Sequence, residues 1–323
     1  MKRLRHALPF LGLLAMLSGC GLDPVQSNPD TQVVLQAFLT PGAPIDRVVL
    51  RRTIPPSEYY AWVPLDAYAI SRADVVLTHP GGTTMLPERS PGVYGDPSII
   101  AQAGARYSIA ISFPAGHEFH GRTLSASTTV PLPIEMGYTL GQSLRNKGVT
   151  TLDTLTFPQG LAYPDSFAGA GEMDLQPFSL SWNRVANCAG YLVGTTARDT
   201  VGTGFLRRTD YKNWLDGDFK NPSVRQFRKT SGFFVLPDSL RIDVFWVLFA
   251  YQGSTDVLVL AADANYFDYF RTAMNGPGGQ SGNDADTGVL SHVKGGLGVF
   301  GSYTADTVRT YIKPEWLPSA HVR

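Results

Sequence analysis

The fold class of this chain is indicated by Val33-Val34-Leu35-Gln36-Ala37-Phe38-Leu39, which is followed by Thr40-Pro41-Gly42-Ala43-Pro44 and then by Asp46-Arg47-Val48-Val49-Leu50-Arg51-Arg52. The first and last of these runs are rich in β-branched and aliphatic residues, which favour strands. The middle run holds two prolines and a glycine, which mark a turn. This order of segments predicts a β-hairpin at the start of the folded chain.

Strand-like runs continue at residues 73–78, 107–113 and 123–130, and turns such as His79-Pro80-Gly81-Gly82 separate them. Several short strands spaced by turns are typical of a β-sandwich of about 100 residues. Pro131-Leu132-Pro133 should end this unit, because proline donates no amide hydrogen to a central ladder. We therefore predict an N-terminal immunoglobulin-like β-sandwich over residues 31–133.

The second half of the chain also has the pattern of strands. Residues 178–183 and 190–195 flank a short turn and look like the start of a fibronectin type III sandwich, in which Trp182 and Tyr191 would face the core. Apolar runs at residues 241–251 and 256–260 suggest strands that are covered on both faces. The predicted fold class is all-β, with two tandem β-sandwiches, the second being a fibronectin type III-like domain with insertions over residues 134–323.

One segment interrupts the strand pattern and predicts a single short helix in the second domain. Asp263 is a suitable N-cap for residues 264–274, where Tyr266, Phe267, Phe270 and Met274 fall on one helical stripe. Gly276-Pro277 would end the helix, and the following residues to 288 are rich in Gly, Asn and Asp, which predicts a loop.

The amino-terminal residues have the pattern of an export signal. Lys2, Arg3 and Arg5 precede the apolar run of residues 7–17, which is too short for a spanning helix of about 20 residues. The run ends in Leu17-Ser18-Gly19-Cys20, which resembles the lipobox of bacterial lipoproteins and implies cleavage before Cys20 and lipidation of that residue. Residues 20–30 would then be a lipidated tether. The alternative is a secreted soluble protein with an incidental cysteine.

The net charge bears on which partners the chain can bind, and the cysteine count bears on whether it can form a disulfide. The 27 basic and 27 acidic residues become 24 and 27 once residues 1–19 are removed, a net charge of −3. Such a mild charge predicts no nucleic-acid partner, because those proteins carry clustered Lys and Arg. If Cys20 is lipidated, Cys188 has no intramolecular disulfide partner and is expected to be a buried structural residue.

The stretch Gly295-Gly296-Leu297-Gly298-Val299-Phe300-Gly301 resembles a family that carries such a segment near its end, after an aromatic segment like residues 266–270. The family is that of Bacteroidota-type envelope lipoproteins grouped as domain-of-unknown-function family 4249. Residues 47–52, Ser90-Pro91-Gly92-Val93-Tyr94 and the threonine-rich run that ends at Pro133 agree with it, whereas residues 202–231 do not match. The resemblance implies a β-rich outer-membrane lipoprotein, often found with TonB-dependent transporters, and no known catalytic residues.

No motif predicts catalysis, a cofactor or a metal. Gly296 to Gly301 match G-x-G-x-x-G, but a strand rather than a helix is expected at 308–312, so the glycines should permit bulges or close backbone approach. His117, Glu118 and His120 could contribute metal ligands, yet flanking glycines favour a polar turn between two strands. No G-x-S-x-G occurs, and no serine has a local base partner.

Two aromatic stretches are candidate contacts for a ligand or a partner. One holds Tyr59, Tyr60, Trp62 and Tyr68, for which packing against the sandwich is the alternative. The other holds Arg207, Arg208, Tyr211 and Trp214, for which a solvated insertion is the alternative.

These features together predict a lipid-anchored, non-enzymatic envelope protein. It would be held on a membrane through Cys20 and would act as a binding or accessory subunit, beside an outer-membrane transporter or another envelope protein. Two alternatives remain open. One is an envelope-polymer hydrolase with carboxylates on different strands, and the other is a structural surface protein that self-assembles.

Overall fold

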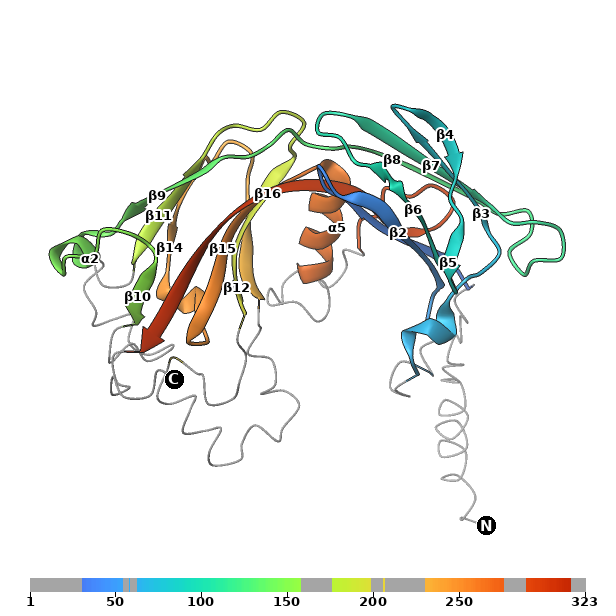
Figure 1. Cartoon of the computed structure of the whole chain (residues 1–323). Coiled ribbons are helices and arrows are strands. Elements are labelled where there is room, and N and C mark those ends of the chain that lie inside the picture. Colours follow the sequence, from blue (N-terminus) through green and yellow to red (C-terminus); the bar gives the residue numbers. More distant parts are fainter. Residues whose placement is uncertain are drawn as a thin grey trace, which may run out of the picture.

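The computed structural model describes residues 31–54, 58, 63–157, 176–198, 206, 230–275 and 289–314. These residues form mainly β-strands, arranged in three sheets (Figure 1). Two hydrophobic cores lie between the sheets, and the predicted all-β sandwich fold class is confirmed. No helix in this described part of the chain is both long and apolar enough to span a bilayer.

The largest sheet extends through both halves of the molecule. Its strands, in spatial order, are β13 (Thr230–Val235), β12 (Gly190–Ala197), β15 (Gly253–Ala262), β16 (Leu297–Pro314), β1 (Val33–Leu39), β2 (Pro44–Arg52), β6 (Val93–Ile100) and β5 (Glu88–Ser90), and β10 (Thr154–Phe157) also pairs with β16. A smaller sheet covers each half. The order β4 (Gly82–Met85), β3 (Asp74–His79), β7 (Arg106–Ser112), β8 (Thr123–Thr129) forms one, and β14 (Arg241–Val244), β11 (Phe178–Trp182), β9 (Met136–Leu140) forms the other.

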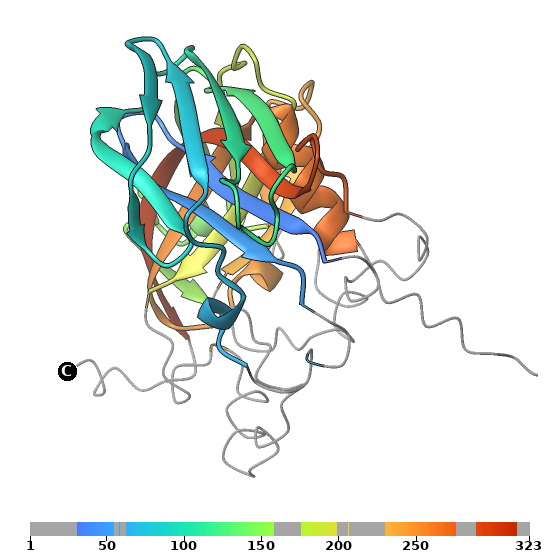
Figure 2. The same cartoon turned by 90° about the vertical axis from the view of Figure 1, so that its right-hand side faces the viewer.

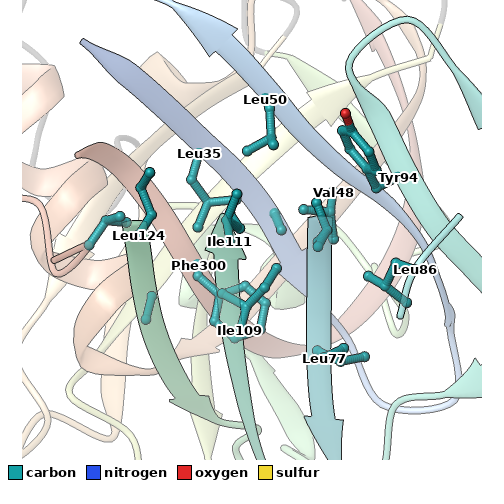
Figure 3. Packing of buried hydrophobic residues seen from close by; sticks show 14 of the residues in the cluster. Leu35, Val48, Leu50, Leu77, Leu86, Tyr94, Ile109, Ile111, Leu124 and Phe300 are labelled. Carbon is teal, nitrogen blue, oxygen red and sulfur yellow. The ribbon is translucent and has the colours of Figure 1, made fainter. Parts of the chain in front are cut away.

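The predicted hairpin is confirmed as β1 and β2, which pair antiparallel with Leu35 opposite Leu50. Alternate residues of β1 are buried, as expected for a strand with one face on a core. Figure 3 shows how Leu35 and Leu50 face Ile109 and Ile111 of β7, with Phe300 of β16 in the same core. The N-terminal sandwich therefore includes a residue from the far end of the chain.

Strand β16 joins the two halves. Its first part, from Leu297 to Ser302, runs parallel to β1, and its second part, from Tyr303 to Ile312, runs antiparallel to β15. In Figure 1 it arches across the molecule from the N-terminal half to the C-terminal half. One core draws on residues 33–130 with Val293 and Phe300, and the other on residues 134–312. The last described strand thus contributes to both cores.

The C-terminal core contains the predicted aromatic pair. Trp182 and Tyr191 are 6% and 0% exposed, and their ring centroids lie 5.3 Å apart. Strand β15 has eight of its ten residues buried, which confirms that it is covered on both faces. The prediction of core-facing aromatic residues is therefore confirmed.

The prediction of one strand over residues 241–251 is wrong. Strand β14 ends at Val244, and a 3-10 turn covers Trp246–Leu248. Trp246 and Phe249 both enter the core, where Trp246 packs on Phe157 at 5.4 Å and Phe249 on Phe178 at 6.4 Å. Residues three apart point to opposite faces of a strand, so only a turn allows both rings to enter one core.

The predicted helix is confirmed as α5 (Ala264–Asn275), and a second, five-residue helix, α2 (Gln142–Asn146), was not predicted. Asp263 caps α5 as expected, because its Oδ1 accepts the amide hydrogen of Tyr266 at 2.9 Å. Figure 2, turned by 90° from Figure 1, shows the orange helix α5 next to part of the red strand β16, with which it packs.

The glycines near the end of the chain allow the close approaches that the sequence predicted. Gly298 has φ +108°, and a Cβ there would collide with the carbonyl oxygen of Leu35 on β1. A Cβ at Gly301 would lie 2.8 Å from the amide nitrogen of Tyr266 at the start of α5. The glycine segment is therefore a packing element between β1, β16 and α5.

Candidate functional site

Most residues that the sequence singled out lie outside the described part of the chain. These are Cys20, Tyr59, Tyr60, Trp62, Arg207, Arg208, Tyr211 and Trp214. Their roles stay predictions.

Tyr68 is the one member of the aromatic sets that the structure describes. It ends the short 3-10 helix Leu65–Tyr68 and is 2% exposed. Its hydroxyl donates a hydrogen bond to Glu58 Oε2 at 2.9 Å, and the Arg52 guanidinium lies 5.7 Å from its ring centroid. Burial, followed by the hydrogen bond to Glu58, raises the pKa of Tyr68. In this arrangement Tyr68 packs inward and does not present its ring to a ligand.

A cleft of about 430 Å³ lies on the face of the four-stranded sheet that points away from the core. Three strands form its floor, and the residue types there are small and mostly hydroxylated: Thr78 on β3, Ser108 and Ala110 on β7, Ser125 and Ser127 on β8. Asn265 of α5 and the segment with His292 and Lys294 complete the lining. This cleft is the candidate functional site.

Strand register explains why the hydroxyl groups converge. Thr78 lies opposite Ser108, and Ser108 lies opposite Ser127, so three side chains form one row across the sheet. Directly paired residues have Cβ atoms about 5 Å apart. Their neighbours Leu77, Ile109 and Thr128 are buried on the other face. The row is therefore a consequence of the two-residue period of the strands.

Two basic side chains flank this row. Arg106 is exposed, and its Nη2 donates a hydrogen bond to Ser127 Oγ at 3.2 Å. Lys294 is exposed, and its backbone pairs with that of Ser125 through two hydrogen bonds of 3.0 and 2.8 Å. No carboxylate is among the described residues that line the cleft, so the lining has net positive charge.

His292 lies at the edge of the cleft and already has a partner. Its Nε2 is 3.0 Å from Asp268 Oδ2 on α5, and Asp268 also pairs with Arg271 at 3.4 Å. These groups link the cleft-lining segment to the helix.

A buried polar cluster lies where β8, β16 and α5 meet, next to the cleft. Thr128 donates its hydroxyl hydrogen to Asp263 Oδ2 at 2.5 Å and lies 2.6 Å from the Ser302 hydroxyl. The amide of Ser302 donates to Asp263 Oδ1 at 3.1 Å. Asn265 Nδ2 donates to the carbonyl oxygens of Ser127 and Phe300, at 2.7 and 2.8 Å. The cluster fixes β8, and hence the cleft floor, against β16 and α5.

Asp263 is the ionisable member of this cluster and is 5% exposed. Burial raises its pKa, although hydrogen bonds from Thr128, Tyr266 and Ser302 act in the opposite direction. A buried carboxylate is stabilised only when such donors surround it. The arrangement indicates a structural carboxylate rather than a group exposed to a substrate.

The histidine cluster forms the predicted polar turn between β7 and β8. His117 Nε2 lies 3.0 Å from the carbonyl oxygen of Ser71, and His120 Nδ1 lies 3.2 Å from that of Phe113. The imidazole of His117 also stacks on the Phe113 ring at 4.9 Å. Within the described ranges, no group of three or more His, Cys, Asp and Glu side chains is placed to hold a metal ion.

Cys188 is half-buried, and its thiol donates a hydrogen bond to the Gly190 carbonyl oxygen at 2.9 Å. Burial raises the pKa of this thiol, which disfavours the nucleophilic thiolate. Cys188 is thus less buried than predicted, and its geometry agrees with a structural cysteine.

Sequence reasoning missed Arg106, Lys294 and the serine row. A local signal exists in β8, where Ser125, Ser127 and Thr129 alternate with buried residues. It identifies an exposed hydroxyl face but not the partners that complete a cleft. Lys294 and Asn265 reach it only through the long-range packing of β16 and α5.

Comparison with solved structures adds little to this description. Two fibronectin type III domains of chicken tenascin match with 10% identity and a TM-score of 0.19, over 73% of this chain and 93% of that chain. The first three fibronectin domains of chicken CNTN1 match with 10% identity and a TM-score of 0.21, over 87% and 67% respectively. At these scores the fold assignment depends on the strand pairing of this chain alone.

No curated protein matches the chain. A family model described as a domain of unknown function, DUF4249, matches residues 22–309, which include the N-terminal core, the glycine segment and all of the C-terminal core except Ile312. The resemblance seen in the glycine-rich segment is thereby confirmed at the level of the family, and the chain belongs to the DUF4249 family.

Proposed function

We propose that this protein is a lipid-anchored component of the cell envelope, attached to the outer membrane through Cys20, with a non-enzymatic binding or accessory role. Its position would be beside a TonB-dependent transporter or another envelope protein. The cleft on β3, β7 and β8 is the observation that carries the binding role. It offers hydroxyl and cationic donors, and no carboxylate is among its described lining residues.

The residues that line the cleft favour a binding role over a polymer hydrolase and over a structural surface protein. A polymer hydrolase of the usual kind needs two carboxyl groups on opposite sides of a cleft, about 5 to 10 Å apart. Two described acids lie near the cleft: Asp268, which is paired with His292 and Arg271, and Asp263, which is buried and bonded to Thr128, Tyr266 and Ser302. A purely structural surface protein would need no cleft with convergent polar groups.

The anchor is tested by Cys20→Ser. We expect the variant to lose palmitate labelling and most of its membrane-bound fraction, because acyl chains on Cys20 would supply the hydrophobic attachment. Palmitate labelling and membrane fractionation of whole cells measure both effects.

Cys188→Ser is the matched control, since it removes the half-buried thiol of the β-domain and should leave labelling unchanged. Equal labelling of the Cys20→Ser variant and the natural chain would refute the anchor.

The binding role is tested by photo-crosslinking in intact cells. A photoreactive phenylalanine in place of Ala110, which is exposed on the cleft floor, should give a specific adduct that is absent when the same group replaces Tyr138 on β9. Adducts that do not depend on position would speak against the cleft as the binding site.

A further inference from the structure

We propose that the cleft binds a phosphate group, either free or as part of a lipid headgroup, between Arg106 and Lys294. This inference rests on the proposed binding function and names its ligand class. Three features of the described residues carry it: the charge of the lining, the arrangement of donors, and the kinds of side chain that the lining contains.

The charge of the lining favours an anion. Arg106 and Lys294 are both exposed, and no carboxylate lines the described cleft beside them. Asp268, the acid closest to the edge, is paired with His292 and Arg271. Asp74 lies on the same face of β3 but opposite Ser112, at the other end of the strand from Thr78. Among the described lining residues, the two cations therefore have no acidic partner.

The donors are arranged around one point. Arg106 reaches Ser127 from one side, at 3.2 Å, and the backbone of Lys294 is paired with Ser125, the next residue on the same face of β8. Residues two apart on a strand lie about 7 Å from each other. An anion above Ser127 would thus lie between the two long basic side chains, with hydroxyl donors of Ser108 and Ser127 beneath it. Charged donors combined with hydroxyl groups suit phosphate oxygens.

The same lining disfavours other ligands. The described lining holds no Phe, Tyr or Trp, and its imidazole, that of His292, is paired with Asp268, so a sugar ring or a nucleobase would lack a wide stacking surface. The small floor residues Ala110, Ser108 and Ser125 let a compact polar group approach the sheet closely. A phosphate or phosphomonoester is the ligand class that uses all of these groups.

The test uses the full chain purified in a non-ionic detergent, at low ionic strength, with inorganic phosphate as the probe. Arg106→Gln and Lys294→Gln should each weaken phosphate binding about tenfold in calorimetric titrations, and the double variant should show no measurable binding. Arg47→Gln is the matched control, because Arg47 is exposed on β2, outside the cleft, and its loss should change the affinity less than about twofold. Lys294→Arg, which keeps the charge, should retain most of the affinity.

Vesicles of phosphatidylcholine with and without phosphatidic acid distinguish the two sources of phosphate. Binding that requires phosphatidic acid, is competed by inorganic phosphate and is lost in the double variant would assign a lipid headgroup. Phosphate binding without vesicle binding would show that the ligand of the cleft is a free phosphate compound.

The inference is overturned if the double variant binds phosphate as well as the natural chain does, if acetate binds more tightly than phosphate, or if neither phosphate nor phosphatidic acid vesicles bind. A chain that crosslinks from the Ala110 position yet binds no phosphate would overturn the ligand class alone and leave the binding function standing.

Discussion

Replacing Gly298 with alanine is expected to lower the free energy of unfolding by more than about 4 kcal/mol, which is at the upper end of single-residue effects. Gly298 has φ +108°, a conformation that side chains rarely adopt, and it pairs with Leu35 on β1. A Cβ at this position would overlap the Leu35 carbonyl oxygen, which belongs to the backbone and has no rotamer to change. Relief would require β1 and β16 to separate, which opens the N-terminal core. Chemical denaturation followed by circular dichroism measures the loss.

Gly42→Ala is the matched control for this prediction. Gly42 also has positive φ, +77°, but a Cβ there would meet nothing within 4 Å. Its substitution should lower the free energy of unfolding by about 1–2 kcal/mol, which is the backbone strain of a side chain at positive φ. Equal losses for the two variants would show that β1 and β16 are not packed as closely as described.

Asp263→Ala is expected to have the second large effect. It should lower the free energy of unfolding by about 3 kcal/mol or more. The substitution removes the N-cap of α5 and leaves the Thr128 hydroxyl and the Ser302 amide without their acceptor. Asp96→Ala offers a comparison, because Asp96 accepts hydrogen bonds from the amide and hydroxyl of Ser98 at the surface. Water can replace those bonds, so a clearly smaller loss is expected there. Similar losses would argue that the Asp263 cluster does not hold β8 to β16.

The pH dependence of this effect follows from the raised pKa of Asp263, which burial causes. A carboxyl group with a raised folded-state pKa contributes stability that is fully present below its ordinary pKa of 3.8 and is lost as pH rises through the raised value. Asp263→Asn cannot titrate. The free energy of unfolding of the natural chain, relative to that of this variant, should therefore decrease as pH rises above 3.8. A difference that stays constant with pH would contradict the raised pKa.

The sequence predicted those elements that depend on patterns of neighbouring residues. The hairpin of β1 and β2, the core positions of Trp182 and Tyr191, and the Asp263 cap of α5 depend on strand period, aromatic burial and capping, which are visible within about ten residues. Strand β6 was missed because Gly95, Asp96 and Pro97 interrupt its apolar pattern, and its pairing with β2 contains register shifts. Strand β10 was also missed, because it has only four residues and pairs with the distant end of β16.

The candidate site could not be predicted because long-range pairing builds it. Lys294 reaches the cleft through its backbone bridge to Ser125, and Asn265 through the packing of α5 on β8 and β16. The glycine segment that identified the family makes this packing possible, since Gly295 and Gly296 approach Thr123 and Leu124 of β8. A glycine-rich motif in the sequence indicates that the backbone approaches another segment closely, but it does not identify that segment.

Phosphate binding in the cleft is tested most directly by a crystal structure of the full chain grown with phosphate at saturating concentration. The expected result is a phosphate within hydrogen-bonding distance of the Arg106 guanidinium and the Lys294 ammonium group, above Ser127. A phosphate bound elsewhere, with the cleft on β3, β7 and β8 unoccupied, would contradict the assignment of phosphate to this cleft.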